Sequence, residues 1–336
     1  MLRPGYDMWL NPVSRIMGLR TVGQTPQSRP AQVAAMRDPA RSRHDTQTKR
    51  RFSEIDLTEL RTRAARPLSF QPRPFLRWAG SKRALLNHIV EVLPSRYLTY
   101  REPFLGSGSL FFLLQPSKAV LSDSCFELIQ TFQAVRDGGE SILGYLTSLK
   151  PDKQQYYAIR SNLSPDPLER AAQFLYLNKT CWNGLYRVNS RGEFNVPYGA
   201  PKTDFIVDAP NLLACSTALK GESIQLNCTD FEAAVAEACE GDLVFLDPPY
   251  VTRHNNNGFI DYNETLFSWH DQIRLATQAK RLADLGASVI VTNALHSDIR
   301  DLYGEFKVRS IDRASTLASA STKRGRVQEG VYWNIS

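Results

Sequence analysis

The chain has 336 residues, 42% of them hydrophobic and 22% charged, a composition that is typical of a globular protein and excludes a fibrous or wholly disordered chain. No run of residues approaches the ~18 consecutive apolar residues of a membrane helix. The net charge is +7, and residues 1–70 alone hold 13 Lys and Arg against 6 Asp and Glu, so the remainder is neutral overall. We expect a cytoplasmic protein without a membrane partner, because the Arg-rich amino terminus also lacks the apolar core of a secretory signal.

Residues 1–70 are predicted to form a basic, disordered extension, because Arg, Pro, Gln, Ser and Thr dominate and no helical or strand period is sustained. Within this extension only Ser53–Ala65 favours a short helix. Three interpretations stay open: an arm that tethers DNA, a dispensable extension from an upstream start codon, and an Arg-rich transit peptide.

Neither cysteine nor histidine shows the spacing of a metal site. The five cysteines include no C-x-x-C pair, and their odd number argues against a disulfide framework. The five histidines are scattered along the chain. We therefore expect no bound metal.

Order is predicted to begin at Phe75–Lys82, where a glycine turn leads into an amphipathic helix that ends at Pro94. The free N–H groups at the start of that helix, beside Lys82, suit an anionic group such as a carboxylate. A strand at Leu98–Arg101 follows, and then a glycine-rich turn, Glu102–Ser109, opens a helix through residue 114. Its glycines, Gly106 and Gly108, allow a ligand to approach the backbone closely.

Two further strands end in side chains that suit a nucleoside. The strand Ala119–Leu121 runs into Asp123, a carboxylate at the position that holds ribose hydroxyls in nucleoside-binding sheets. The strand Ile224–Asn227 is followed by Asp230 and Phe231, which offer an acceptor to an adenine amino group and a ring to its face.

The most informative strand is Leu243–Leu246, an apolar run that must stop at Asp247 because Pro248 has no N–H for a ladder. The Asp247 carboxylate and the Pro248 carbonyl are two acceptors side by side, which suits a planar amino group, and Tyr250 can stack on a flat base. An ordinary proline turn with a capping Asp is the alternative for these residues alone. Three more strands bring the predicted sheet to about seven: Ser288–Thr292, Phe306–Arg309 and Val331–Ile335.

About a hundred residues between Asp123 and Ile224 do not have the pattern of a sheet and its crossovers. Three helices are predicted there: Phe126–Val135, Ser141–Leu149 and Leu168–Leu177. The segment Asn178–Gly199 then alternates aromatic, polar and basic residues about an N-S-R-G turn, which predicts a hairpin. Its polar side chains can bind base edges and phosphates, although an ordinary surface hairpin remains open: Asn183, Arg187, Asn189 and Arg191.

Five segments occur in the order found in one known family. They are F-L-R-W-A-G-S-K at 75–82, E-P-F-L-G-S-G-S at 102–109, the block 174–199, T-D-F at 229–231 and D-P-P-Y at 247–250. Together they resemble the Dam family (D12 class) of DNA adenine-N6 methyltransferases, from Phe75 to the carboxyl terminus. The N-G-L and R-G-E-F-N-V-P strings within the block are specific to that family rather than to methyltransferases in general.

The resemblance implies an α/β fold: a Rossmann-like sheet of about seven strands that binds S-adenosylmethionine, with an inserted helical and β-hairpin subdomain for DNA recognition. It implies a catalytic domain of residues 71–130 and 206–336 and a target-recognition insertion of residues 131–205. The implied partners are double-stranded DNA and a cognate restriction endonuclease, the implied state is a monomer, and the implied location is the nucleoid.

The resemblance also assigns roles to single residues. The implied cofactor pocket consists of Trp78, Lys82, Phe104, Gly106, Gly108, Asp123, Asp230, Phe231 and Asp247. The implied catalytic residues, which hold a flipped adenine, are Asp247, Pro248 and Tyr250. The implied DNA contacts are Arg77, Trp182, Asn183, Leu185, Arg187, Arg191 and Pro197.

One departure affects the expected target sequence. Relatives often carry a basic residue just after the V-P-aromatic-G string, whereas Ala200-Pro201 follows here, which weakens the transfer of GATC as the target. Methylation of RNA or of a protein amide, and a silent DNA-binding protein with this fold, stay open as alternatives. The run Asn255–Gly258 is interpreted as a loop that closes over substrate or as a plain surface loop.

Overall fold

The strand β6 (Leu243–Leu246) lies in the interior of a seven-stranded sheet and is buried along its whole length. The fold is that of a computed structural model, which describes residues 51–65, 71–203, 206–250, 267–314 and 326–335. Successive residues of β6 face opposite sides of the sheet, and both sides are packed: Leu243 and Phe245 join one hydrophobic core, and Val244 and Leu246 join the other. Burial on both faces explains why the strand is a continuous apolar run.

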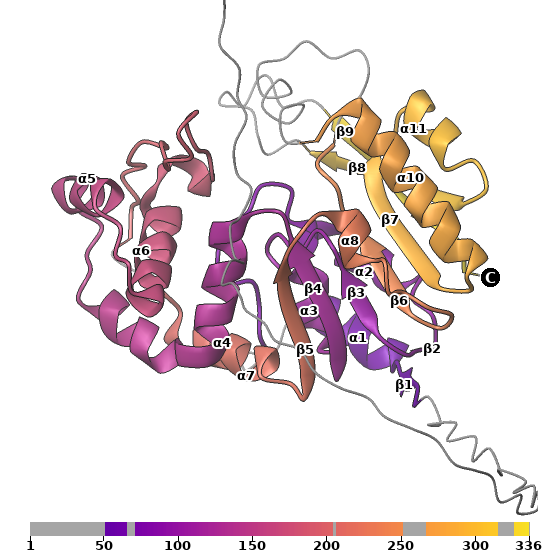
Figure 1. Cartoon of the computed structure of the whole chain (residues 1–336), viewed down its shortest axis with the longest axis horizontal. Coiled ribbons are helices and arrows are strands. Elements are labelled where there is room, and N and C mark those ends of the chain that lie inside the picture. The colour runs from indigo at the N-terminus through magenta and orange to yellow at the C-terminus, as the bar shows by residue number, and fades with distance from the viewer. Residues whose placement is uncertain (1–50, 66–70, 204–205, 251–266, 315–325, 336) are drawn as a thin grey trace, which may run out of the picture. The chain divides into compact units, whose positions relative to one another are not determined.

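The sheet has the order β5-β4-β3-β6-β7-β9-β8. The strands β5, β4, β3, β6 and β7 are mutually parallel, and β9 pairs antiparallel with both β7 and β8 (Figure 1). Their bounds are Tyr100–Glu102 for β3, Lys118–Asp123 for β4, Ser223–Cys228 for β5, Ser288–Ala294 for β7, Lys307–Ala314 for β8 and Arg326–Trp333 for β9. The predicted α/β fold with a sheet of about seven strands is confirmed.

The direction in which strands are added reverses between β3 and β6. The chain moves outward through β3, β4 and β5 and then returns to place β6 beside β3. At such a reversal the loops after the two strands separate, and ligands of open α/β sheets bind in the crevice between them. The segments Glu102–Ser109 and Asp247–Tyr250 follow these two strands, so both predicted motifs lie at this reversal.

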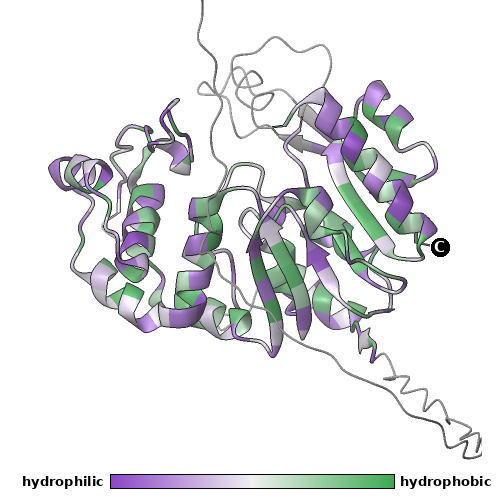
Figure 2. Cartoon of the chain, viewed as in Figure 1, coloured by the Kyte–Doolittle hydropathy of each residue, from purple (hydrophilic) through white to green (hydrophobic). Residues whose placement is uncertain are grey.

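Helices cover both faces of the sheet, as the two cores show (Figure 2). One core takes residues from the 3₁₀ turn η1 (Lys82–Leu85), α2 (Leu86–Val90), α3 (Ser109–Leu114), α4 (Phe126–Thr147) and α7 (Ala209–Leu219). The other takes residues from α8 (Phe231–Ala234), α10 (Trp269–Asp284) and α11 (Ser297–Leu302). The long helix α10 begins at a capping box formed by Ser268 and Asp271.

The chain between β4 and β5 is helical, as predicted, but its helices differ in detail. The predicted helices Phe126–Val135 and Ser141–Leu149 form one element, α4, which is kinked at Gly138. A Cβ at Gly138 would lie 2.6 Å from a side-chain atom of Leu168, so a larger residue there would displace the Leu168 side chain. The helix α5 (Lys153–Ser161) was not predicted, and α6 (Pro167–Thr180) is three residues longer at its carboxyl end than predicted.

The predicted hairpin after α6 has little regular strand structure. It contains the short 3₁₀ turn η2 (Trp182–Gly184) and two isolated bridges, Cys181 to Tyr198 and Val188 to Phe194. The tip is closed by the backbone bond from Asn189 N–H to Glu193 O, 2.9 Å long. The two arms therefore lie antiparallel, with loop geometry over most of their length.

The described part of residues 1–70 packs on the same unit as the sheet. Within Ser53–Ala65 the predicted helix is confirmed as α1 (Leu57–Ala65), and it packs against α2 and α3 with Leu60 buried. Just before it, β1 (Ser53–Glu54) pairs with β2 (Arg96–Tyr97). Residues 1–50 and the run Asn255–Gly258 lie outside the described residues, and the division into domains stays a prediction.

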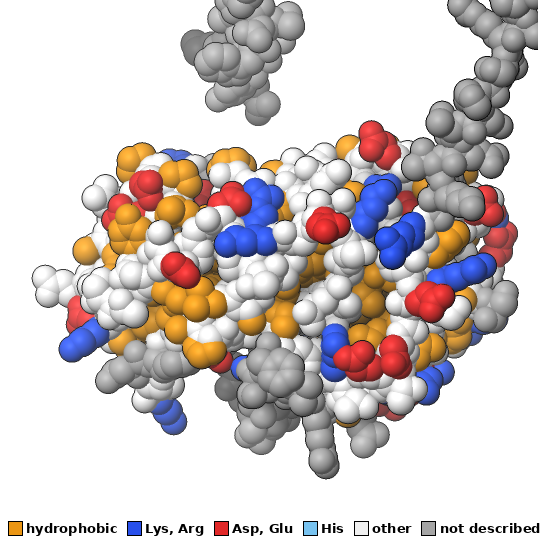
Figure 3. All heavy atoms as spheres, turned by 90° about the horizontal axis from the view of Figure 1, so that it is seen from below, with side chains coloured by type: hydrophobic (Ala, Val, Ile, Leu, Met, Phe, Trp, Pro, Cys, Tyr) orange, Lys and Arg blue, Asp and Glu red, His pale blue; other side chains and the backbone are white. Residues whose placement is uncertain are grey.

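Two properties of the described residues concern possible partners. No helix among them has both the length and the apolar character needed to cross a bilayer. The face that carries β1 and β2 is seen in Figure 3, where Lys and Arg side chains are interspersed with Asp and Glu. This face therefore presents no continuous basic surface.

A buried ion pair joins β3 to the start of β6. Arg101 Nε lies 2.7 Å from Asp242 Oδ2, and the Asp242 side chain is fully buried. Asp242 also accepts hydrogen bonds from the backbone N–H groups of Thr99 and Cys239, and Arg101 donates to the carbonyl of Glu237. The charges are thus satisfied at the end of the two strands opposite to Asp247.

Removing one partner of this pair will destabilise the fold. We expect Asp242→Ala to lower the free energy of unfolding by about 3–5 kcal/mol, because the Arg101 guanidinium would stay buried without its counterion. Chemical denaturation measures this. The matched control is Arg63→Ala, which removes a surface pair with Glu59 and should change the free energy of unfolding by less than about 0.5 kcal/mol. Equal effects of the two variants would contradict the prediction.

Candidate active site

The centre of the candidate site is the carboxylate of Asp247, at the tip of β6. Its Oδ1 atom accepts a hydrogen bond from Thr292 Oγ1 at 2.6 Å and pairs with Lys82 Nζ at 2.7 Å. Thr292 comes from the neighbouring strand β7. Lys82 is the last residue of the F-L-R-W-A-G-S-K segment and the first residue of the turn η1. Within the described part of the chain both donors go to Oδ1 and none goes to Oδ2. Among these residues the second oxygen therefore has no donor.

Burial and the Lys82 ammonium act on Asp247 in opposite directions. Burial raises the pKa of this carboxyl group above its ordinary value, while Lys82 and the Thr292 hydroxyl group lower it. Lys82 is itself only 5% exposed, and its ammonium also donates to the carbonyl of Gly80 at 2.7 Å. The cation is thus held in place as a fixed partner of the carboxylate.

The turn after Asp247 is held by side chains from distant parts of the chain. Pro248 and Pro249 have no backbone N–H, so they cannot extend the ladder. Gln272 Nε2, on α10, donates to the Pro249 carbonyl at 3.3 Å, and Asn293 Nδ2, on β7, donates to Gln272 Oε1 at 2.9 Å. Both amides are fully buried. Neither amide was predicted from the sequence. A glutamine among the apolar residues on the buried face of α10 is the signal that could have indicated Gln272.

The Tyr250 ring is fixed at two points. Its hydroxyl group donates to Oε2 of the buried Glu329 at 3.1 Å, and Lys82 Nζ lies 4.5 Å from its ring centroid. Burial raises the pKa of Tyr250 well above its ordinary value, and the nearby charges of Asp247 and Glu329 raise it further. The ring is therefore neutral and oriented. Glu329, on β9, was also missed by sequence reasoning.

The tip of β4 and the glycine turn after β3 are bonded together. Asp123 accepts hydrogen bonds from the backbone N–H groups of Gly106, at 2.9 Å, and of Cys125, at 3.0 Å. Burial raises the pKa of Asp123, and these N–H groups oppose that rise. Gly106 and Gly108 have φ values of 48° and 67°, and a Cβ at Gly106 would lie 3.0 Å from the Trp78 ring, so glycine is required at this turn.

The residues expected around an adenine ring lie beside an arginine. Phe104 stacks on Phe231 with ring centroids 5.4 Å apart, and Arg274 lies 4.7 Å from the Phe231 centroid. Arg274 also donates to Asp230 at 2.9 Å and pairs with Glu232 and Asp271, each at 2.7 Å. These carboxylates raise the pKa of Arg274, which is thus a fixed cation. Sequence reasoning missed this arginine.

The residues expected to contact DNA lie around the hairpin. All are exposed except Leu185, which is half-buried: Arg77, Trp182, Asn183, Leu185, Arg187, Arg191 and Pro197. Arg187 donates to Asn195 Oδ1 at 2.8 Å, and Arg191 pairs with Glu193 at 3.3 Å near the tip. The Trp78 ring stacks on Tyr186 with ring centroids 5.4 Å apart, which joins the hairpin to the segment before η1.

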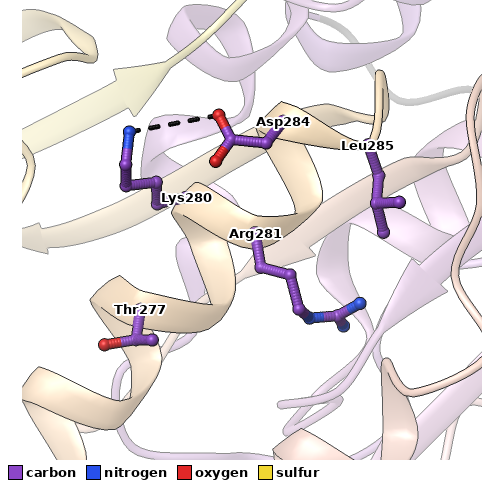
Figure 4. A pocket seen from close by; sticks show the side chains of 5 residues that line it. All are labelled: Thr277, Lys280, Arg281, Asp284 and Leu285. Atoms are coloured by element: carbon purple, nitrogen blue, oxygen red, sulfur yellow. Dashed lines mark ion pairs between the residues drawn. The ribbon is translucent and has the colours of Figure 1, made fainter.

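Neither a metal cluster nor the pocket on α10 coincides with these residues. No group of three or more His, Cys, Asp or Glu in the described ranges could hold a metal ion. A pocket of about 420 Å³ lies on the outer side of α10 (Figure 4), lined by Thr277, Lys280, Arg281, Asp284 and Leu285. It contains none of the residues described above.

Comparison with known proteins decides the family. Residues 78–317 match the D12 class N6 adenine-specific DNA methyltransferases. The chain belongs to this family. It is 38% identical to a Type II methyltransferase of Lactococcus lactis subsp. cremoris over 270 residues, which cover 78% of this chain and 95% of the relative.

Two other relatives support the assignment. A Type II methyltransferase of Methanocaldococcus jannaschii is 34% identical over 284 residues, which cover 77% of this chain and 96% of the relative. A DNA adenine methylase of Haemophilus influenzae is 32% identical over 268 residues, which cover 76% and 92%. The sequence-based assignment to the D12 class is therefore confirmed, and the chain is an adenine-specific DNA methyltransferase.

The balance at Asp247 can be tested directly in this D12-class chain. We expect Lys82→Met to raise the pKa of Asp247 further, because the carboxylate loses its cation while burial continues to oppose its charge. The carboxyl ¹³C resonance measured against pH reports this, with Asp247→Asn to assign the signal. The matched control, Lys280→Met on α10, should leave the titration unchanged. An unchanged or lowered pKa in Lys82→Met would contradict the prediction.

Proposed function

We propose that this D12-class chain transfers a methyl group from S-adenosylmethionine to the exocyclic amino group of an adenine flipped out of duplex DNA. The observation that carries the proposal is the tip of β6. There Lys82 and Thr292 both bond to Oδ1 of Asp247, and no donor among the described residues bonds to Oδ2. We take Oδ2 and the carbonyl of the next residue, Pro248, as the two acceptors of a site that also contains the oriented ring of Tyr250. An adenine amino group, with two hydrogens and a flat ring, fits this set.

The amino lone pair of adenine is delocalised into the ring, which makes it a poor nucleophile. When bound, the methyl donor supplies an electrophilic methyl group on a sulfonium sulfur. Asp247 and the Pro248 carbonyl accept the two amino hydrogens, favour a pyramidal nitrogen and stabilise the positive charge that grows there. Lys82 favours the ionised form of Asp247 against the effect of burial and orients the carboxylate, and Tyr250 stacks on the base.

The residues at the tips of β3, β4 and β5 fit a nucleoside-bearing methyl donor. Asp123 has the carboxylate to accept ribose hydroxyl hydrogens, and the Asp230 side chain is 50% exposed, so it can accept a hydrogen bond from the adenine amino group. Gly106 and Gly108 allow the turn after β3 its positive φ values, and the Gly106 N–H group bonds to Asp123, so this turn lies beside the proposed ribose site. The proposed pocket is completed by Trp78, Lys82, Phe104, Phe231 and Asp247.

DNA recognition is proposed for the face that carries the hairpin. Arg77 and the exposed hairpin residues would contact bases and phosphates, with Trp182, 45% exposed, wedged at the target. The opposite face, which carries β1 and β2, mixes both charges and offers phosphates no continuous basic surface (Figure 3).

The biological setting is a further part of the proposal. We take GATC as the first candidate target, with the reservation that Ala200-Pro201 replaces a basic position after Gly199. The Type II methyltransferase names of two relatives support a cognate restriction endonuclease as partner. We also propose that the protein is a monomer in the cytoplasm, at the nucleoid, where its substrate is.

Replacing the central carboxylate should abolish the reaction. We expect Asp247→Ala to lower methyl transfer to DNA by at least 10²–10³-fold, as for loss of one preorganised catalytic hydrogen-bond partner, while cofactor binding persists. Labelled methyl transfer and calorimetric titration with S-adenosylmethionine measure the two effects. Asp284→Ala, on the outer side of α10, is the matched control and should retain full activity. Retained activity in Asp247→Ala would refute the assignment.

The target sequence follows from a second measurement. Unmethylated DNA treated with the enzyme and S-adenosylmethionine should contain N6-methyladenine at one sequence motif in single-molecule sequencing. Methylation at GATC would support the target taken first. Methylation at another motif would keep the chemistry and reject GATC, and a folded chain that leaves DNA unmodified would reject the proposed substrate.

A further inference from the structure

A buried asparagine forms two hydrogen bonds with the backbone of Arg77. Asn178 lies in the last turn of α6 and is 2% exposed. Its Oδ1 accepts the Arg77 N–H at 2.8 Å, and its Nδ2 donates to the Arg77 carbonyl at 2.8 Å. A single side chain thus holds both polar groups of one residue, which determines where that residue lies relative to α6.

The same amide reaches the recognition turn. Asn178 Nδ2 also lies 3.4 Å from the Gly184 carbonyl, which belongs to η2. Gly184 has a φ of 63°, and a Cβ there would lie 2.4 Å from Arg77 Cδ. The aliphatic part of Arg77 therefore packs directly on the backbone of this turn, and only glycine allows the approach. The Arg77 side chain is consequently held against the turn that also carries the exposed Asn183.

We propose that Asn178 is a positioning residue for DNA specificity: it orients Arg77 for the base pair that Arg77 reads. This inference rests on the proposed function, in which Arg77 contacts DNA. An arginine distinguishes a base by a bidentate fork with strict geometry, and its long side chain loses that geometry when the backbone shifts. The amide of Asn178 limits this shift, so it controls discrimination without contacting DNA.

The chain contains a matched control for this arrangement. Asn211, on α7 and 8% exposed, accepts the Arg73 N–H at 2.9 Å and donates to the Arg73 carbonyl at 3.0 Å. Arg73 is paired with Asp208 at 3.2 Å and lies four residues before Arg77. The two asparagines therefore make the same bidentate contact, and only Asn178 also reaches the recognition turn.

The test compares specificity rather than activity alone. Methyl transfer is measured on the duplex that the wild type methylates and on duplexes with single base-pair changes, as ratios of kcat/KM. Each ratio divides kcat/KM on the unchanged duplex by kcat/KM on a duplex with one changed base pair. The position at which Arg77→Ala lowers this ratio is the base pair that Arg77 reads. We expect Asn178→Ala to lower the ratio at that same position about tenfold or more, with S-adenosylmethionine binding retained. Asn211→Ala should leave every ratio within twofold.

Two further variants make the result independent of stability. In the Arg77→Ala background, Asn178→Ala should lower the ratio no further, because the residue that it orients is gone. Asn178→Asp keeps an acceptor for the Arg77 N–H but loses both donated bonds, and it replaces the alanine variant in this test if that variant does not fold. It should reduce the kcat/KM ratio at the same base pair.

The inference fails if a folded Asn178 variant keeps its ratio within twofold, if the ratio falls equally at all positions, or if Asn211→Ala has the same effect. A wild-type chain that methylates no DNA removes the proposed function together with this inference. An active wild type with an unchanged ratio in the Asn178 variant removes the inference alone.

Discussion

The turn of residues 247–250 cannot be held by its own backbone, and this constraint explains much of the surrounding structure. Pro248 and Pro249 supply no N–H groups, so the sheet cannot continue past Asp247. The turn is held instead by four side chains from four other elements: Lys82 from η1, Thr292 from β7, Gln272 from α10 and Glu329 from β9. Among the described residues, Lys82 and Thr292 bond to Asp247 Oδ1 and no donor bonds to Oδ2. The proposed substrate amino group would therefore meet an acceptor that is already oriented.

These supports depend on the order of the strands. Because β6 returns to lie beside β3, the turn after β6 and the glycine turn after β3 meet at one edge of the sheet. The buried pair of Arg101 and Asp242 joins the same two strands at their other end. The register of the central strands, and with it the position of Asp247, is thus held at both ends.

Contacts of Trp78 and of Asn178 connect the segment that carries Lys82 to the hairpin. The Trp78 ring stacks on Tyr186, and the Asn178 amide joins the backbone of Arg77 to that of Gly184. Arg77, Trp78 and Lys82 belong to one short segment, so a displacement of the hairpin would be transmitted to the partner of Asp247. The structure thereby couples the proposed reading of DNA to the proposed chemistry through a few buried contacts.

Much of this architecture follows from local sequence. The apolar run Leu243–Leu246 predicted a strand buried on both faces, and the proline after Asp247 predicted its end, because these properties depend on neighbouring residues. The α/β class and the seven strands were predicted for the same reason. The helices α5, α7 and α10 were missed. The two helices predicted within α4 correspond to its two helical segments on either side of the kink at Gly138, where the backbone is not helical.

The hydrogen-bond partners of the site residues could not be predicted from local sequence. Nothing near Asp247 in the chain indicates that Thr292, 45 residues away, would donate to it, or that Glu329 would hold the Tyr250 hydroxyl group. The contact from Asn178 to Arg77 spans 101 residues. By itself the sequence determined the strands, the polar residues at their carboxyl ends and the family, since each of these depends on a short run of residues. Only the tertiary structure decided which oxygen of Asp247 is occupied and which residues orient the proposed contacts, because strand order brings distant segments together.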